Sequence, residues 1–427
     1  MRLTAVLSGR QLAFGAIEPY NRANGMHLLM IAPEPFFEPR GTPFSEFHRI
    51  RALLDLGHTV DLVTYPFGRD VSMPGLRIFR CLRPPFVRSV RIGPSAAKVP
   101  LDLALAVAAA RRALRQRYDA VHSHEEGSAI GVVLAGLFGL PHLYDMHSSL
   151  PQQLENFDFS RSRLLRAVFA WIERLVIRRS RVVVVICQHL QQTVREIEPT
   201  ARTVLIENAP GAGDSPIPGS GAAVRAGLGV AAGMPVVLYT GTFEAYQGLD
   251  LLLKAAGQVA RRIPDVLFVL VGGRPGQIAE ARRLAEAAGA AGHVRFTGER
   301  PAEEIPAYLD AADVLVSPRS TGTNTPLKIY QYLRAGRPIV ATRLLTHTQV
   351  LDDEVAILTE PTAEDFAGGI ARALEDAALA RRVGDRARAL AETKYSYQAY
   401  LDRTAEACAA LAGDADARLV AVRSDEP

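Results

Sequence analysis

The sequence has few cysteines, a single tryptophan and no long apolar run. Its 427 residues include three cysteines, Cys81, Cys187 and Cys408, which lie far apart and lack metal-ligand spacing. This argues against a disulfide framework or a cysteine zinc site, and it favours a reducing, cytoplasmic setting. Charged residues interrupt the apolar stretches well before the roughly 20 residues that a membrane-spanning helix needs. Residues 1–25 show no signal-peptide pattern, and we expect a disordered extension there, with Met26 as an alternative start.

A strong excess of one charge sign is also missing. The chain has 49 Lys and Arg against 45 Asp and Glu, which gives a formal net charge of +4. This mild basic character favours anionic ligands or an anionic membrane surface as partners. Because basic and acidic residues are interleaved and no basic stripe carries aromatic residues, we do not expect nucleic-acid binding.

Strand-like and helix-like segments alternate twice along the chain. Apolar runs such as His27–Ala32 and Val182–Ile186 occur in the first half, and Val236–Tyr239 and Leu267–Val271 in the second. Continuous β-branched runs suit strands that are buried on both faces of a parallel sheet. Asn208–Ala223, rich in Gly, Pro, Ser and Ala, predicts a linker between the halves. We therefore predict an α/β chain with two Rossmann-like, doubly wound domains and a ligand site where the carboxyl ends of the strands meet.

Two common nucleotide-binding patterns are absent. Neither half has a Gly-x-Gly-x-x-Gly turn after its first strand, since the chain reads Pro33–Thr42 in one case and Thr240–Phe243 in the other. A phosphate-binding Gly-x-x-x-x-Gly-Lys loop is missing as well. Both absences disfavour a dehydrogenase and a phosphate-loop NTPase.

The most informative segment runs from Ser317 to Gly336. Thr325 is a suitable N-cap, Pro326 suits the first helical position, and Gly336 suits the end of the helix. The free N–H groups at such a helix start form an anion site, and Lys328 adds positive charge in the first turn. The pattern predicts a diphosphate site, and the alternative is a solvated surface lysine on an ordinary capped helix.

This segment, continued by Ala335–Thr342, resembles the donor-binding segment of the retaining glycosyltransferases of family four, which have the GT-B fold. The resemblance extends over nearly the whole chain and implies two Rossmann-like domains that face each other across a cleft. Its other motifs, in the family's order, are Gly57–Val60, Tyr118–His124, Glu207–Pro210 and Phe296–Gly298.

The resemblance also shows where this chain departs from the family. The family binds its donor with two glutamates separated by seven residues, and Thr323 and Gln331 stand at those positions here. Thr242 and Gln247 stand where the family commonly has Arg and Lys. This implies a divergent branch in which Lys328 and Arg319 supply the positive charge. Thr323 or Asn324 would then contact the sugar, and Gln331 the ribose. Gly241, Thr242, Thr325 and Gly298 complete the expected donor set.

For the first domain, the resemblance matches His147 to a histidine that contacts the donor sugar near its reacting carbon. Asp145 is expected to orient its ring, and the alternative is a histidine packed at a strand end. His122, His124 and Glu125 are further candidates. Arg40–Thr42 resembles a loop that approaches the donor phosphates or the acceptor, with Gly41 allowing close backbone approach.

The implied reaction moves a sugar from a UDP- or GDP-sugar to a glycan, a lipid-linked or a small-molecule acceptor, with retention of configuration. We expect His147 and Lys328 to be catalytic and no metal or cofactor to be required, because Asp414–Asp416 lies in a polar tail. Two alternatives stay open. One is a nucleotide-sugar 2-epimerase or hydrolase on the same fold, and the other is a non-catalytic nucleotide-binding scaffold.

The expected domains are 26–208 and 209–394, with a helix at about 395–412 returning to the first domain and a disordered tail at 413–427. Arg163–Arg179 is a basic amphipathic helix. It has two interpretations: a membrane-surface helix at the inner face of the membrane, or a helix whose apolar stripe packs on the sheet while its arginines face water. We favour the second interpretation, because doubly wound domains need such helices.

Overall fold

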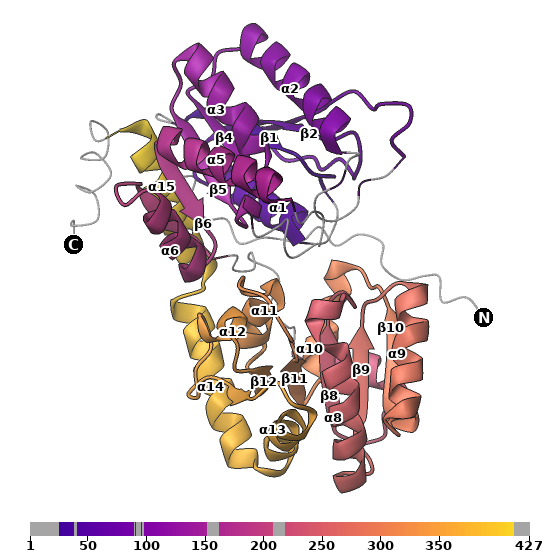
Figure 1. Cartoon of the computed structure of the whole chain (residues 1–427). Coiled ribbons are helices and arrows are strands. Elements are labelled where there is room, and N and C mark those ends of the chain that lie inside the picture. The colour runs from indigo at the N-terminus through magenta and orange to yellow at the C-terminus, as the bar shows by residue number, and fades with distance from the viewer. Residues whose placement is uncertain are drawn as a thin grey trace, which may run out of the picture.

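The computed structural model describes residues 25–37, 41–88, 90, 95, 98–151, 162–207 and 218–413. These residues form two parallel sheets, each covered by helices, as Figure 1 shows. The extension at 1–24, Arg40, most of the linker and the tail from 414, including Asp414–Asp416, lie outside the described residues. The predicted α/β fold with two Rossmann-like sheets is confirmed.

The first sheet has seven parallel strands in the order β3-β2-β1-β4-β5-β6-β7. The strands are β1 (His27–Ala32), β2 (Thr59–Thr64), β3 (Leu76–Arg80), β4 (Ala120–His124), β5 (His142–Met146), β6 (Val182–Val185) and β7 (Thr203–Leu205). The helices are α1 (Gly41–Asp55), α2 (Lys98–Arg115), α3 (Gly127–Phe138), α5 (Arg163–Arg179) and α6 (Gln188–Ile197). Because β4, β5 and β6 are buried along their whole length, their apolar runs form the core on both faces of the sheet.

The second sheet has six parallel strands in the order β10-β9-β8-β11-β12-β13. The strands are β8 (Val236–Thr240), β9 (Leu267–Val271), β10 (Val294–Gly298), β11 (Val314–Ser317), β12 (Ile339–Thr342) and β13 (Ile357–Thr359). The helices are α7 (Gly221–Gly227), α8 (Leu249–Arg262), α9 (Pro275–Ala287), α10 (Ile305–Ala311), α11 (Leu327–Ala335), α12 (Leu345–Thr348), α13 (Ala363–Glu375) and α14 (Ala377–Thr393). In each sheet the strand order reverses once, between β1 and β4 and between β8 and β11. Ligands of doubly wound domains bind at the carboxyl ends of strands beside such switch points.

The last helix connects the two halves. α15 (Tyr397–Ala412) packs against α1, β6 and β7 of the first sheet, although it directly follows α14 of the second (Figure 1). The Tyr397 hydroxyl donates a hydrogen bond to Asp55 of α1 at 2.5 Å, and Arg49 of α1 donates one to Thr404 at 3.2 Å.

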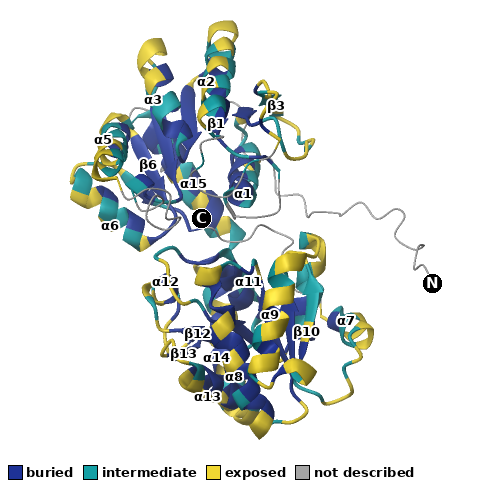
Figure 2. Ribbon diagram, turned by 45° about the vertical axis from the view of Figure 1, so that its right-hand side comes forward, coloured by how far each residue is buried: buried dark blue, intermediate teal, exposed yellow. Residues whose placement is uncertain are grey.

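Figure 2 colours each residue by how far it is buried and shows that much of α5 is exposed. On α5, Val176 and Ile177 are buried against the sheet, but Leu164 and Trp171 are exposed to 76% and 64%. We expected the apolar stripe of this helix to pack on the sheet. That expectation is wrong for the part of the stripe that contains Leu164 and Trp171. Among the described residues, no helix is both long and apolar enough to cross a membrane.

Candidate functional site

The side chain of Lys328 is buried at the carboxyl edge of the second sheet. It comes from α11 and is 8% exposed, with its Nζ 3.8 Å from the centroid of the Tyr239 ring and 3.4 Å from Oε1 of Gln247. In the described part of the chain, no carboxylate forms an ion pair with it. Burial, reinforced by the charge of Arg319, lowers the pKa of Lys328 well below its ordinary value. The alternative of a solvated surface lysine is therefore wrong.

Arg319 is a second cation at the same edge, in the loop after β11. Its Nη1 donates hydrogen bonds to the carbonyl of Asn324 at 3.2 Å and to the hydroxyl of Thr346 at 3.1 Å. Its guanidinium carbon lies 5.1 Å from the centroid of the Tyr246 ring. Burial lowers its pKa, and no carboxylate among the described residues pairs with it. Two basic side chains that have no carboxylate partner within the described residues thus lie at the switch point between β8 and β11.

Glycines leave space beside Lys328. Gly241 follows β8 with a φ of +137°, and a Cβ there would lie 3.1 Å from the Lys328 Nζ. A Cβ on Gly272 would lie 1.9 Å from the carbonyl oxygen of Gly241, so this close backbone approach requires glycine at position 272. Gly298, at the end of β10, forms a bridge with Gly272.

Thr242 and Gln247 extend this group of polar residues. The Thr242 hydroxyl accepts from Nε2 of Gln247 at 3.4 Å, and Oε1 of Gln247 accepts from Lys328. Of the two positions where the family resemblance implies Arg and Lys, Gln247 contacts the lysine of α11 directly, and Thr242 is linked to it through Gln247. This contact was not evident from the sequence, because it depends on how η2 (Ala245–Gln247) folds back.

The loop between β11 and α11 meets the first domain. Nδ2 of Asn324 donates to the carbonyl of His147 at 2.7 Å, and the carbonyl of Thr323 accepts from Gln349 at 2.6 Å. Thr325 is buried but does not cap the helix: the N-cap is Pro326, and α11 begins at Leu327. The prediction of Thr325 as N-cap and Pro326 as first helical residue is wrong, because the ψ of Pro326 is 137°, which is extended. Gln331 is half-buried on α11.

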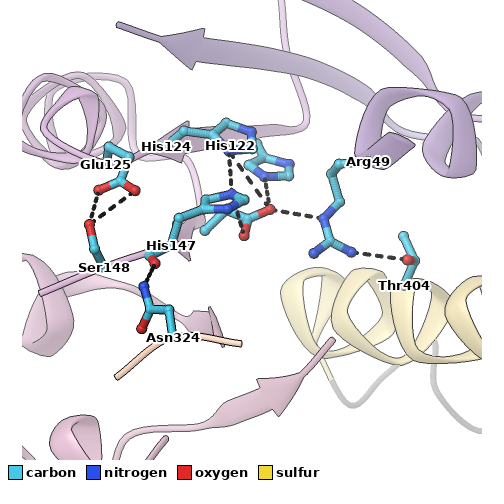
Figure 3. A network of polar contacts seen from close by, with 9 residues as sticks. Arg49, His122, His124, Glu125, His147, Ser148, Asn324 and Thr404 are labelled. Carbon is cyan, nitrogen blue, oxygen red and sulfur yellow. Dashed lines mark hydrogen bonds and ion pairs between the residues drawn. The ribbon is translucent and has the colours of Figure 1, made fainter. Parts of the chain in front are cut away.

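In the first domain, a buried polar network includes Arg49, His122, His124 and His147 (Figure 3). Its central carboxylate is that of Asp145. Oδ2 of Asp145 accepts from Nε of Arg49 at 2.8 Å and lies 3.3 Å from Nε2 of His122, while its Oδ1 lies 3.3 Å from Nε2 of His147. Burial alone would raise the pKa of Asp145, but the charge of Arg49 overrides it and holds that pKa well below its ordinary value. The carboxylate of Asp145 thus lies within ion-pair distance of the His147 ring.

His122 and His124 complete this network. Their rings stack with centroids 4.8 Å apart, and Nδ1 of His124 lies 3.3 Å from Nε2 of His147. Burial lowers the pKa of both His122 and His124, which keeps them neutral near pH 7. β4 and β5 bring these residues together because His124 pairs in register with Asp145.

Glu125 lies beside this network, and its backbone conformation is unusual. It has a φ of +45°, which is rare for a residue with a side chain, and it accepts from the Ser148 hydroxyl at 2.9 Å. Burial raises the pKa of Glu125 to about 8. The sequence interpretation missed Arg49, although an arginine on the inner face of a predicted helix is a usable signal. Gly41 and Thr42, expected in a loop, are the first residues of α1.

His122, His124 and Asp145 also offer three ligand atoms within 4.8 Å of one another. This donor set of two imidazoles and a carboxylate would suit zinc. However, Arg49 already lies 2.8 Å from the same carboxylate, and its charge would oppose a cation there. The geometry fits an internally paired network better than a metal centre.

Two family models match the chain. A "Glycosyl transferase 4-like domain" matches residues 48–209, and "Glycosyl transferases group 1" matches residues 223–390. Both halves of the chain are thus similar to glycosyltransferase domains. The first of these two matches covers the Asp145 network, and the second covers Lys328 and Arg319.

The chain is also similar to named bacterial enzymes. It is 26% identical over 307 residues to an alpha-D-kanosaminyltransferase of Streptomyces kanamyceticus, which covers 69% of this chain and 78% of that protein. It is 32% identical over 285 residues to a 2-deoxystreptamine N-acetyl-D-glucosaminyltransferase of Streptomyces fradiae, covering 63% of this chain and 65% of that protein.

Solved structures show the same fold. A sucrose-phosphate synthase from Thermosynechococcus elongatus aligns with a TM-score of 0.74 at 21% identity, covering 93% of this chain and 100% of that one. The Anabaena protein HepE in complex with UDP aligns with a TM-score of 0.70 at 18% identity, covering 90% and 100%. At these identities the similarity establishes the GT-B fold alone.

Proposed function

We propose that this chain is a glycosyltransferase that moves a sugar from a nucleoside diphosphate sugar to a hydroxyl-bearing acceptor with retention of configuration. The observation that carries the proposal is the pair of cations, Lys328 and Arg319, which lack a carboxylate partner among the described residues. Burying a charge without a partner is costly, and a diphosphate would supply the missing negative charge. HepE, which has the same fold, was solved with UDP.

In this mechanism Lys328 and Arg319 stabilise the diphosphate as negative charge develops on it. The bond between the anomeric carbon and the diphosphate oxygen breaks, the acceptor oxygen bonds to that carbon on the same face, and the departing phosphate oxygen takes the acceptor's proton. His147, oriented by Asp145, contacts the sugar near this carbon. The two side-chain cations take the role that a metal ion has in other sugar transferases, so no metal or cofactor is required.

The acceptor class we propose is a polyhydroxylated molecule, either a small molecule, a glycan or the head of a lipid-linked sugar. Support comes from the names of the relatives, which include 2-deoxystreptamine, D-inositol 3-phosphate and phosphatidylinositol monomannoside. These acceptors share ring hydroxyls.

The proposal is tested by thermal shift with UDP, GDP, ADP, TDP and CDP. A nucleotide at a hundred times its dissociation constant should stabilise the wild type by about 2.7 kcal/mol. Lys328→Ala should lose most of this shift. Lys254→Ala, which removes an exposed lysine of α8, should keep it.

Donor turnover then separates the alternatives. Transfer to an acceptor supports the proposal, whereas conversion of the donor without any acceptor would indicate an epimerase or hydrolase. Nucleotide binding without turnover of any sugar donor would indicate a scaffold. No stabilisation by any nucleotide would contradict the role given to Lys328 and Arg319.

A further inference from the structure

Three helices of the first domain turn large apolar side chains towards solvent. Their exposed fractions lie between 59% and 76%, although helices that cover a sheet normally direct such residues inwards. The side chains are Leu103 and Leu114 on α2, Val133 and Leu137 on α3, and Leu164 and Trp171 on α5.

These side chains follow the helical repeat on the outer side of each helix. Val133 and Leu137 are four residues apart, and Leu164 and Trp171 are seven apart, so each pair lies on one face. α2 packs against α3, and α3 packs against α5, so the three outer stripes are neighbours (Figures 1 and 2). We call the surface formed by these six side chains the apolar face.

The charges around the apolar face are of one sign. α3 contains no charged residue at all. The acidic residues of α2 and α5, Asp102 and Glu173, are engaged inwards: Asp102 accepts from Tyr65 at 2.5 Å, and Glu173 accepts from the Leu150 N–H at 2.7 Å. The outward charges are therefore arginines.

Several of these arginines have no acidic partner in the described residues. Arg111 and Arg115 lie near the end of α2, and Arg174 and Arg179 lie in the second half of α5, all of them exposed. A large apolar patch on a water-soluble chain marks a binding surface, and an apolar patch with an arginine rim suits the interface of an anionic bilayer.

We propose that the apolar face docks the enzyme on an anionic lipid membrane, with the six apolar side chains among the acyl chains and the arginines at the headgroups. A second copy of the chain fits this face less well, because a twofold contact would bring the arginines of both copies together. The docked helix would also reach the site: Glu173, on the inner side of α5, holds Ser149 and Leu150, which closely follow His147.

The chain carries its own probe, because Trp171 is its single tryptophan. The full-length protein is mixed with phosphatidylcholine vesicles that contain phosphatidylglycerol, and with vesicles of phosphatidylcholine alone. With the anionic vesicles, Trp171 emission should shift to shorter wavelength and become shielded from iodide, and added salt should weaken the effect.

Variants locate the surface. Leu137→Glu and Leu164→Glu should each weaken vesicle binding by about tenfold, because they place a negative charge in the bilayer interface. Ala279→Glu, which adds the same charge to an exposed position of α9, should bind as the wild type does. All four proteins should have the same far-UV circular dichroism, since the substituted side chains are exposed.

Two outcomes would overturn the proposal. One is an unchanged Trp171 emission when the folded wild type meets anionic vesicles. The other is a dimer in solution that already shields Trp171 without lipid and that Leu137→Glu dissociates.

Discussion

Glu46, which lies near Asp145, is a carboxyl group in surroundings that disfavour its charged form. It lies on α1 with no exposed surface, and neither carboxyl oxygen accepts a hydrogen bond among the described residues. Burial, together with the nearby charges of Glu34 and Asp145, raises the pKa of Glu46 well above its ordinary value. Such surroundings favour the protonated form of the carboxyl group. Functional sites commonly hold groups of this kind, because the rest of the fold tolerates their cost.

Glu125 gives a prediction of pH dependence. Its folded pKa of about 8 lies above its ordinary value of 4.5, because burial disfavours its charged form. Between these values the unfolded chain has lost the proton and the folded chain keeps it, so stability falls as pH rises and levels off above pH 8. Glu125→Gln should therefore be the more stable protein at pH 9 by at least about 1 kcal/mol, or roughly 2–4 °C. Melting curves at pH 5 and pH 9 measure this; an equal difference at both values contradicts it.

The buried ion pair of Arg49 and Asp145 gives a second prediction. Their side chains are 2% and 0% exposed, so Arg49→Met leaves a buried carboxylate without its main partner. We expect a loss of about 3–5 kcal/mol in the free energy of unfolding, measured with urea. Adding Asp145→Leu should recover much of this loss. If Arg49→Met costs less than about 1 kcal/mol, Asp145 does not depend on the pair.

At the scale of elements, α11 connects the cation site to the core. Tyr332 of α11 accepts from the Thr240 N–H at 3.0 Å, which fixes the helix against the end of β8, and Tyr330 packs against Tyr395 with ring centroids 5.1 Å apart. The C-cap of α11 is Gly336, whose φ of +63° lies in the left-handed region. The position of Lys328 therefore depends on both ends of a nine-residue helix.

Gly336→Ala should destabilise the protein by about 1–2 kcal/mol, because an L-residue in the left-handed region is strained. The new Cβ would also lie 2.5 Å from Nε of Arg388, which must move. Gly276→Ala is the matched control. This glycine lies in α9, and a Cβ placed on it would have no atom within 4 Å. The variant should be more stable than the wild type by up to about 1 kcal/mol in the free energy of unfolding. Equal melting temperatures for the two variants would contradict the argument.

The elements differ in how far the sequence predicts them. The apolar runs predict β1, β6, β8 and β9 to within one residue, because strands buried on both faces must be apolar throughout. β3 was not predicted, because two arginines interrupt the apolar residues of Leu76–Arg80, which lies at the sheet edge. The start of α11 was predicted one residue early, because a proline's φ suits both a first helical position and an N-cap.

The site itself was predicted only in part. Strand ends and the family resemblance indicate His147, Asp145 and Lys328, and the structure brings the first two together. Arg49 was missed because its partner, Asp145, lies 96 residues further on, and only the place of Arg49 on the inner face of a predicted helix could have indicated it. The burial of Lys328 under Tyr239 is likewise a tertiary contact that no local pattern encodes. The functional roles of the predicted residues stay predictions.

At the scale of the whole molecule, hydrogen bonds join the edges of the two sheets. Gln349 uses both ends of its side-chain amide: Oε1 accepts from the His189 N–H at 2.8 Å, and Nε2 donates to the carbonyl of Thr323. Asn324, expected to contact the donor sugar, uses Nδ2 for the carbonyl of His147 instead. Its position thus couples the loop before α11 to the first domain.

Asn324→Ala should separate nucleotide binding from turnover. The nucleotide-induced melting shift should stay close to that of the wild type, because Lys328 and Arg319 remain. The kcat/KM for the donor should fall roughly fivefold, the equivalent of one lost hydrogen bond of about 1 kcal/mol between the domains. Lys328→Ala, in contrast, should lose both the nucleotide-induced melting shift and the turnover of the donor. An Asn324→Ala variant with unchanged kcat/KM would show that this contact does not position His147.

The path of α15 has a consequence for synthesis. The first sheet leaves the ribosome early, but the apolar side of α15 that covers it, including Tyr400, Leu401 and Leu411, is made almost two hundred residues after β7 ends at Leu205. Until residues 397–412 emerge, the surfaces of α1, β6 and β7 that they cover stay open to water and to other chains. Folding of the first half is therefore completed only after translation of the second, and a nascent chain halted before Tyr397 should depend on a chaperone.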